Sequence, residues 1–361
     1  MANSPDKHSQ HESLHQVGLG KILALLVVVF LGLVIFAVGL GSSSLRTRDS
    51  FQILAERLPL IRDLVPRAEI ADKYRVIVFQ LRLPRIILSS LTGAALAIVG
   101  AVFQAVFRNP LADPHILGVS SGAALGATIA IVAGLGTGAL GLGAVGFLAF
   151  IFALATIGLV YTSVGFAGDE RAISSMLLVG VALGTLFSAI ISLLMLFNND
   201  EIKRVYMWTL GSFNSASWDK IRFFSLIFLP CTLYLVFQGR TLNLLLAGEE
   251  EAMSLGLEAA KVRKRLILVS SLLVAASIAV SGIIGFVGLV IPQYLRILGQ
   301  HDLRRQLPLA GLAGAIFLLL CDTAARTLLN PLEIPVGIIT SLFGVPYFIY
   351  VIVKQRLQDR Y

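Results

Sequence analysis

Ionisable side chains inside apolar segments are the first candidates for chemistry in this chain. Asp322 lies in such a segment, and Arg326 follows four residues later, on the same face of a helix. A charge at membrane depth indicates either a functional site or a buried ion pair. Asp322 could carry protons or ions, or it could form a structural pair with Arg326 near the end of its helix. Because the segment holds one acid and a ready cationic partner, we favour the structural pair.

Motifs of common enzymes are missing from the sequence. It contains no GxxxxGK[ST], no HExxH and no GxSxG. A literal GxGxxG occurs at residues 136–141, but this pattern binds dinucleotides only between a strand and a helix, and here it joins two apolar segments. Cys231 and Cys321 lie far apart in apolar segments, so neither a metal pair nor a disulfide framework is indicated. We predict no enzyme, no cofactor, no metal site and no nucleic-acid partner.

Membrane spans are the elements that must position these residues. Apolar residues make up 57% of the 361 residues, charged residues make up 14%, and the mean hydropathy is +0.85. Soluble domains carry about 25% charged residues. The charges cluster and leave apolar segments of about 20 residues, enough for a helix to cross the hydrocarbon core. We predict an all-α polytopic membrane protein with about ten transmembrane helices. The predicted spans are 21–40, 84–107, 115–135, 139–163, 172–197, 219–237, 262–282, 284–299, 307–326 and 335–354.

The polar segments predict the domain organisation and the orientation. Residues 20–355 are expected to form one transmembrane domain between a polar tail, 1–19, and a short C-terminal tail, 356–361. Ten spans place both termini on one side, and the distribution of Lys and Arg predicts that this side is the cytosol. One connection disagrees, because the segment from Arg46 to Arg85 carries nine Lys and Arg against five acids and would face outward.

Glycines at helical spacing mark places where helices could approach closely. Gly118, Gly122 and Gly126 form a stripe along one face of the third span. Gly285 and Gly288 lie where the seventh and eighth spans meet. Small residues allow close helix packing in lipid. Tight packing and a pathway of sliding helices fit the stripe equally well.

A polar turn and a weak internal repeat complete the pattern of the membrane segment. Asn109 and Pro110 belong to a charged turn between the second and third spans. Residues 97–100 and 279–282 resemble each other at an offset of 182, and Pro110 and Pro292 share that offset. Inverted repeats are common in transporters, so we predict a weak inverted repeat.

The connection 248–261 differs from the other loops. It begins with acids and ends with a base, which complements a helix dipole. Gly256 is expected to divide it into two short helices. Ala252, Met253 and Leu255 would form a small apolar surface that could dock on a partner protein. A solvated loop is the simpler alternative.

Many ordered motifs resemble one known family, the permeases of binding-protein-dependent ABC importers for iron chelates and vitamin B12 (the FecCD or BtuC type). The resemblance runs from about residue 20 to residue 355. The matching stretches are RLPR from Arg82, GAALA from Gly93, Gln104, NPLADP from Asn109, LGVSSGA from Leu117, LVGVALG from Leu178, WTLGSF from Trp208, GFVGLVIP from Gly285, DTAAR from Asp322 and EIPVGI from Glu333.

This resemblance implies a type II ABC importer permease fold in the cytoplasmic membrane. It implies a second permease copy, expected as a homodimer, two cytosolic ATPase subunits and an external ligand-binding protein. The residues implied to dock the binding protein are Arg82, Arg85 and Arg326. Those implied to couple to the ATPase are Glu250, Ala252, Leu255 and Gly256. Asn109, Pro110, Gly118, Gly122, Gly126, Gly285, Gly288 and Pro292 are expected to pack around the pathway or its gate.

The family pattern also leaves questions about cargo and mechanism. The family usually has His after the proline of GFVGLV-x-P, whereas this chain has Gln293, which cannot titrate near neutral pH. The expected cargo is an iron chelate, either a siderophore or haem. Vitamin B12 is the alternative, and a proton-coupled secondary transporter that uses Asp322 is a more distant one.

Overall fold

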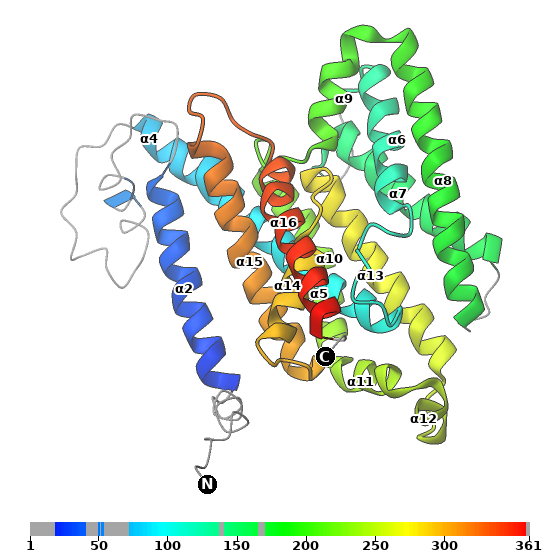
Figure 1. Ribbon diagram of the computed structural model, residues 1–361. Coiled ribbons are helices and arrows are strands. Elements are labelled where there is room, and N and C mark those ends of the chain that lie inside the picture. The colour runs from blue at the N-terminus through cyan, green and yellow to red at the C-terminus, as the bar shows by residue number, and fades with distance from the viewer. Residues whose placement is uncertain are drawn as a thin grey trace.

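A computed structural model describes most of the chain (Figure 1). The described residues are 19–40, 50, 52–53, 72–136, 141–164 and 170–358. Predictions on the N-terminal tail to residue 18, on most of the basic connection 46–71, on 137–140 and on 359–361 lie outside them. Within the described residues all regular structure is helical.

Seven described segments are long and apolar enough to cross a membrane. Six of them lie in the helices α2 (Leu19–Gly39), α7 (Gly143–Val164), α8 (Glu170–Phe197), α10 (Trp218–Phe237), α13 (Ala259–Ser281) and α15 (Leu303–Thr327). The seventh runs through α4 (Asp72–Val76), η2 (Ile77–Arg82) and α5 (Leu83–Val106). Three shorter apolar helical stretches complete the predicted ten: α6 (Val119–Val132), α14 (Val287–Ile297) and the part Val336–Val351 of α16 (Val336–Gln358).

The connections carry further short helices: η3 (Asn199–Glu201), α9 (Ile202–Thr209), α11 (Gly239–Ala247) and α12 (Glu249–Ser254). The beginning of α2, the end of α16, α11 and α12 lie toward one end of the bundle, which we call the α12 end (Figure 1). α4, α9 and the connection 328–335 lie at the opposite, α9 end (Figure 1). The two ends of the described chain therefore share a side, as an even number of spans requires.

The centre of the bundle is α5, which packs against α15, α13 and α14. Small residues make this arrangement possible. A Cβ atom on Gly93 would collide with the backbone of Gly314 in α15, and one on Gly100 would collide with the backbone of Gly288 in α14. Such backbone contacts stabilise helix pairs in lipid, where there is no hydrophobic drive for helices to associate.

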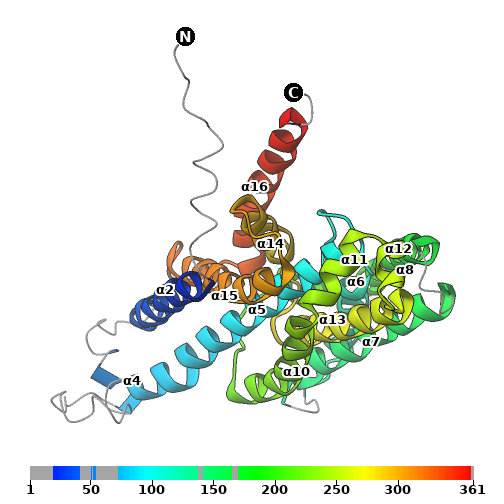
Figure 2. The ribbon, with the colours of Figure 1, turned by 90° about the horizontal axis from the view of Figure 1, so that it is seen from below.

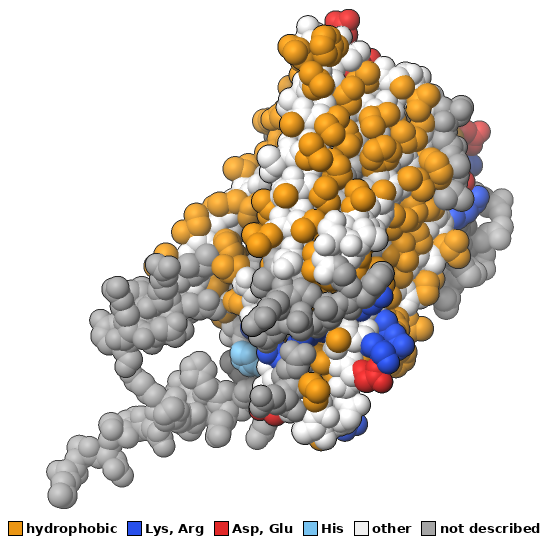
Figure 3. Space-filling model, turned by 90° about the vertical axis from the view of Figure 1, so that its right-hand side faces the viewer, with side chains coloured by type: hydrophobic (Ala, Val, Ile, Leu, Met, Phe, Trp, Pro, Cys, Tyr) orange, Lys and Arg blue, Asp and Glu red, His pale blue; other side chains and the backbone are white. Residues whose placement is uncertain are grey.

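The outer helices expose apolar side chains. α8 covers one side of the molecule, where apolar side chains dominate and Lys and Arg gather toward the lower part (Figure 3). The exposed residues of α8 include Leu178, Val181, Leu193, Leu196 and Phe197. Seen from below, α16 projects away from the main bundle (Figure 2), and it exposes Leu342, Phe343 and Ile349. These faces suit lipid or another apolar protein surface.

Two details of the predicted spans are wrong. The segment 284–299 is predicted as one full span, but α14 has only 11 residues, because Gly282 and Phe286 adopt left-handed backbone angles (φ 72° and 70°) and leave 282–286 non-helical. An 11-residue helix is only about 16 Å long. The offset of 182 residues also does not relate equivalent positions, since Pro110 lies in an exposed turn and Pro292 is buried within α14.

Candidate functional site

A buried ion-pair cluster lies at the α9 end and joins α5, α15 and the connection before α16. Arg85 in α5 directs its guanidinium at Asp322 in α15, with Nη2 2.9 Å and Nε 3.0 Å from Oδ1. Its Nη1 contacts Glu333 Oε2 at 2.8 Å. Asp322 is completely buried, whereas Glu333 is partly exposed. The cluster neutralises Asp322 and holds three segments distant in sequence together.

The predicted pair between Asp322 and Arg326 is therefore wrong. Arg326 instead donates a hydrogen bond from Nη2 to the carbonyl oxygen of Ala37 at 2.6 Å. Ala37 belongs to the last turn of α2, whose carbonyl groups lack partners within the helix and attract a cation. Arg326 lies four residues after Asp322 and therefore on the same face of α15. The guanidinium of Arg85, from the neighbouring helix α5, binds Asp322 instead, through Nε and Nη2.

Arg82 makes a similar contact with the end of α2. It donates to the carbonyl oxygen of Val38 at 2.6 Å and to the hydroxyl of Ser50 at 3.0 Å. The structure thus brings the three predicted docking residues, Arg82, Arg85 and Arg326, to one end of the molecule. Only about 5% of Arg82 and 4% of Arg326 is exposed, and all three arginines bind groups of their own chain. Their role in docking a binding protein stays a prediction.

At the α12 end, the predicted coupling segment forms one short helix. The helix α12 ends in a glycine motif in which the amide of Gly256 donates to Met253 and the amide of Leu257 donates to Ala252. Gly256 adopts φ 78°, a conformation that other residues reach only with strain. Ala252 is fully buried, whereas Met253 and Leu255 are more than 60% exposed. This confirms a helix with an apolar outer surface.

The predicted pair of short helices on either side of Gly256 is only partly right. Gly256 is followed by the long helix α13, and the second short helix, α11, comes earlier in the chain. Between α12 and α13, Glu258 forms an exposed ion pair with Lys261, which holds the pKa of that carboxyl below its usual range. The side chain of Glu250 lies outside the described residues, and the coupling roles of this segment stay predictions.

The turn between α5 and α6 reaches the same end. Arg108 donates from Nε to the carbonyl oxygen of Leu245 at 2.9 Å, which ties the turn to α11, the helix just before the coupling segment. The turn is built by side chains that accept backbone hydrogen bonds: Asn109 Oδ1 accepts from the amide of Leu111 at 2.9 Å, and Asp113 Oδ1 accepts from that of His115 at 2.8 Å. Pro110 is exposed within it.

His115 connects this turn to the non-helical link between α13 and α14. Its Nε2 lies 3.0 Å from the carbonyl oxygen of Ile284, and its Nδ1 lies 2.6 Å from the hydroxyl of Ser120. The carbonyl can only accept, so we assign the proton to Nε2, with Ser120 donating to Nδ1. Both ring nitrogens are occupied, which gives His115 a positioning role that sequence spacing alone did not reveal.

Polar contacts also fix α14, which carries the expected gate residues. Gln104 donates to the carbonyl oxygen of Gly288 at 3.1 Å, and Arg296 donates to Gln104 at 2.7 Å. Pro292 has no amide hydrogen to donate to the carbonyl of Gly288 four residues earlier, and Gln104 supplies a donor to that carbonyl instead. Gln306 donates to the carbonyl oxygen of Pro292 at 2.9 Å. Gly288 is tightly packed, and its Cβ would lie 2.5 Å from a ring carbon of Pro114.

The other expected packing glycines have three different surroundings. Cβ atoms on Gly122 and Gly126 would each come within 2.9 Å of the residue Phe152 in α7. Gly118 instead faces α8, where its Cβ would lie 2.8 Å from the carbonyl oxygen of Gly180. A Cβ atom on Gly285 would have no heavy atom within 4 Å. The stripe therefore lies in two helix contacts, and its part in a sliding pathway stays a prediction.

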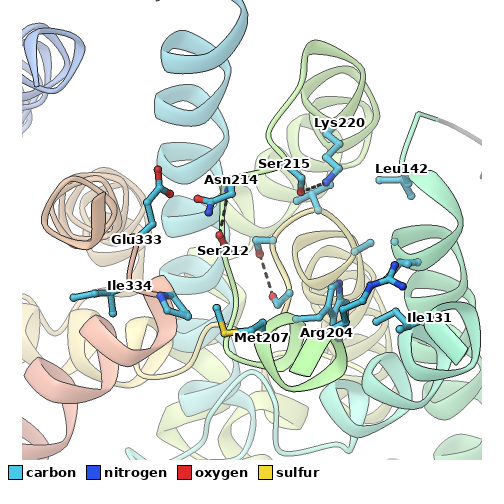
Figure 4. Close-up of a pocket in the computed structure, with 18 residues that line it drawn as sticks. Ile131, Leu142, Arg204, Met207, Ser212, Asn214, Ser215, Lys220, Glu333 and Ile334 are labelled. Atoms are coloured by element: carbon cyan, nitrogen blue, oxygen red, sulfur yellow. Dashed lines mark hydrogen bonds between the residues drawn. The ribbon is translucent and has the colours of Figure 1, made fainter. Parts of the chain in front are cut away.

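A cavity that the sequence did not suggest opens at the α9 end. Its volume is about 420 Å³, and residues of α6, α7, α9, α10, α13 and the connection before α16 line it. Figure 4 shows Asn214, Ser215 and Lys220 on one side and Met207 and Ile334 on another. These residues are spread over more than 200 positions of the chain, which is why no local motif announces the cavity.

Comparisons with known proteins agree with this architecture. Residues 25–354 match the model of the FecCD transport family. The hemin transport system permease protein HmuU of Yersinia pestis is 38% identical over 344 residues, which cover 94% of this chain and 96% of that protein. The vitamin B12 import system permease protein BtuC of Citrobacter koseri is 40% identical over 280 residues, covering 77% and 83%.

A solved structure shares the fold over almost the whole chain. It is described as an inward-facing metal-chelate type ABC transporter, and it superimposes with a TM-score of 0.78 at 35% sequence identity, covering 93% of this chain and 99% of that one. This chain therefore belongs to the FecCD transport family and is a multi-pass permease of the ABC importer type.

Proposed function

We propose that this permease carries an iron chelate, a siderophore or haem, across the cytoplasmic membrane, driven by ATP hydrolysis on two separate ATPase subunits. The observation that carries the proposal is α12. It is a short helix, capped by Gly256 and anchored by the buried Ala252, that presents Met253 and Leu255 outward. An apolar pair on a rigid, polar-flanked helix suits insertion into a groove of a partner protein.

The orientation follows from the charges near α12. Lys261, Arg263, Lys264 and Arg265 begin α13 at this end, and Arg304 and Arg305 begin α15. Cytoplasmic loops carry an excess of Lys and Arg. The α12 end therefore faces the cytosol and the ATPases, both termini are cytosolic, and the α9 end faces the external binding protein.

The second permease copy would bind along an exposed apolar face. α8 offers a continuous one, with Leu178, Val181, Leu193 and Phe197 all more than half exposed. Lipid would also cover these residues, so the face supports a homodimer without requiring it. Two copies would place two α12 helices on the cytosolic side, one for each ATPase.

The cargo proposal is supported by the names of two relatives. HmuU and BtuC are nearly equally similar to this chain, and their names give hemin and vitamin B12 as cargo. Both cargoes are large metal chelates, so we expect the permeases to share a wide pathway rather than one fixed set of residues that bind the cargo. We propose the iron chelate first and vitamin B12 second.

A proton-coupled mechanism through Asp322 is less favoured. A coupling carboxyl must gain and lose a proton in contact with water, whereas Asp322 is fully buried and held by Arg85 at 2.9 Å. The ion pair with Arg85 gives Asp322 a structural role instead.

Reconstitution of the full chain with its ATPase and binding protein tests the proposal. Proteoliposomes containing the complex should take up radiolabelled haemin or ferric siderophore only with ATP and with the ATPase present. Cobalamin uptake under the same conditions would select the second cargo. Uptake that persists without any ATPase would contradict the transport class.

The coupling surface can be tested separately by co-purification. Leu255→Glu places a charge on the apolar surface of α12 without touching the buried Ala252, so the ATPase should be lost from the purified complex while the permease stays folded. Lys203→Glu, an exposed change on α9 at the opposite end, is the matched control. Retention of the ATPase by Leu255→Glu at normal stoichiometry would count against α12 as the coupling helix.

A further inference from the structure

The cavity at the α9 end has an unbalanced charge. Arg204 and Lys220 are its cationic lining residues, and Glu333 is its acid. Arg204 is paired with Glu201 at 2.9 Å, and Glu333 is paired with Arg85 at 2.8 Å. These pairs leave the ammonium group of Lys220 as the uncompensated charge of the lining.

Lys220 is positioned rather than loose. Ser217 caps α10 and accepts a hydrogen bond from the amide of Lys220 at 3.3 Å, so the side chain leaves the first turn of the helix. Its Nζ donates to the hydroxyl of Ser215 at 2.6 Å (Figure 4). Among the described residues, no carboxylate lies within ion-pair distance of Nζ; the neighbouring Asp219 is paired with Arg222. Two of the three ammonium protons therefore remain for a ligand.

The rest of the lining provides hydrogen-bonding groups and an apolar wall. Asn214 lies beside Ser215 and presents its side-chain amide near the cavity (Figure 4). Ile131, Trp208 and Ile334 contribute apolar surface. A volume of about 420 Å³ falls in the range of about 300–1,000 Å³ that small-molecule sites occupy, and mostly apolar walls with a few polar groups are typical of them.

We infer that this cavity binds the anionic group, a carboxylate or a phosphate, of a small amphipathic molecule. The anion contacts Lys220 and Asn214, and the apolar body lies against Trp208 and Ile131. The anionic group has two possible sources, a carboxylate of the transported chelate or the phosphate of a lipid headgroup. The first source rests on the proposed function; the second does not.

Two probes distinguish these sources on the purified full chain in neutral detergent. Haemin supplies carboxylates and is followed by absorbance titration; phosphatidylglycerol supplies a lipid phosphate and is followed by native mass spectrometry. Lys220→Gln should weaken binding of the occupying probe by about tenfold or more, because a hydrogen bond to a charged group is lost. Lys220→Arg should restore most of the affinity.

Lys203→Gln is the matched control, since Lys203 is exposed on α9 and does not line the cavity. If Lys220→Gln loses haemin binding but keeps phosphatidylglycerol binding, the site is assigned to the chelate. If it loses phosphatidylglycerol binding but keeps haemin binding, the site is assigned to lipid. The inference is overturned if wild-type chain binds neither probe saturably, or if Lys220→Gln and Lys203→Gln bind alike. Neither measurement involves the ATPase, so failure of the transport proposal would appear separately, as ATPase-independent uptake.

Discussion

Replacement of Arg85 by methionine should destabilise the protein more than removal of its acidic partner. Arg85→Met keeps an unbranched side chain and removes its charge, which leaves Asp322 buried without its ion-pair partner. Asp322→Leu leaves Arg85 with Glu333 and with a side chain that is 11% exposed. Both single changes therefore remove the contact between Arg85 and Asp322. Arg85→Met leaves the buried carboxylate of Asp322 without its partner, whereas Asp322→Leu leaves Arg85 paired with Glu333.

The magnitude follows from burial. Removal of one partner of a buried ion pair costs about 3–5 kcal/mol, whereas replacement of both by apolar residues is often neutral. The lost contact with Glu333, which is partly exposed, adds no more than about 1 kcal/mol. We expect Arg85→Met to cost about 3–5 kcal/mol, Asp322→Leu to cost clearly less, and the double variant to recover most of the loss.

Thermal unfolding of the detergent-purified chain measures these differences. A change of 1 kcal/mol shifts the midpoint of a domain of 150–250 residues by about 2–4 °C, so Arg85→Met should lower it by about 5 °C or more. Arg222→Met is the matched control, because its ion pair with Asp219 is largely exposed on both sides and should contribute less than about 1 kcal/mol.

Two results would refute this reasoning. One is an Arg85→Met variant no less stable than Arg222→Met, and the other is a double variant, Arg85→Met with Asp322→Leu, that fails to recover. The double variant also isolates the docking prediction: if Arg85 contacts the binding protein directly, docking should fail in this stable background, whereas a purely structural role leaves docking intact.

Three further predictions concern helix packing, the cap of α12 and acid stability. Gly126→Val should cost about 1–3 kcal/mol in thermal unfolding because α7 leaves no room for a side chain, whereas Gly158→Val, on α7 with nothing within 4 Å, should cost little beyond helix propensity; equal losses would contradict close packing. Gly256→Ala should lower stability by about 1–2 kcal/mol through its left-handed backbone, and an unchanged midpoint would show that the cap is not needed. A hydrogen bond from Arg304 lowers the pKa of Asp302 to about 2, so the ionised carboxylate stabilises the fold above about pH 4, and this stabilisation should be lost as the pH falls toward 2. In Asp302→Asn the midpoint of thermal unfolding should depend less on pH between about 4 and about 2 than in the wild type. The same pH dependence in both proteins would exclude the effect.

Much of the fold and part of the candidate site could be predicted because they depend on local properties. Apolar segments of span length place the helices within a few residues, since the cost of exposing backbone groups to lipid leaves helices as the available structure. The helix α12 could be predicted from its terminal charges and from Gly256. Its apolar residues include a buried anchor, Ala252, whereas Met253 and Leu255 are exposed.

Contacts between distant segments could not be read in the same way. The spacing of Asp322 and Arg326 predicts a pair on one helix, and only the packing of α5 on α15 brings Arg85 closer to the acid. The cavity around Lys220 likewise needs six segments to meet. The spacing of residues determines which face of its own helix a side chain occupies. Its contact partner depends on which other helix packs against that face.

The sequence by itself therefore determined that this is a helical membrane protein and where its spans and its α12 segment lie, because lipid restricts the backbone and because helix signals are local. The permease role came from the resemblance of its motifs to a known family. The tertiary structure alone decided that Arg82 and Arg326 hold the end of α2, that Asp322 belongs to Arg85, and that Lys220 is left without an acid among the described residues. Each of these depends on the meeting of helices far apart in the chain, where glycines let backbones touch and bring long cationic side chains within reach of the nearest acceptor.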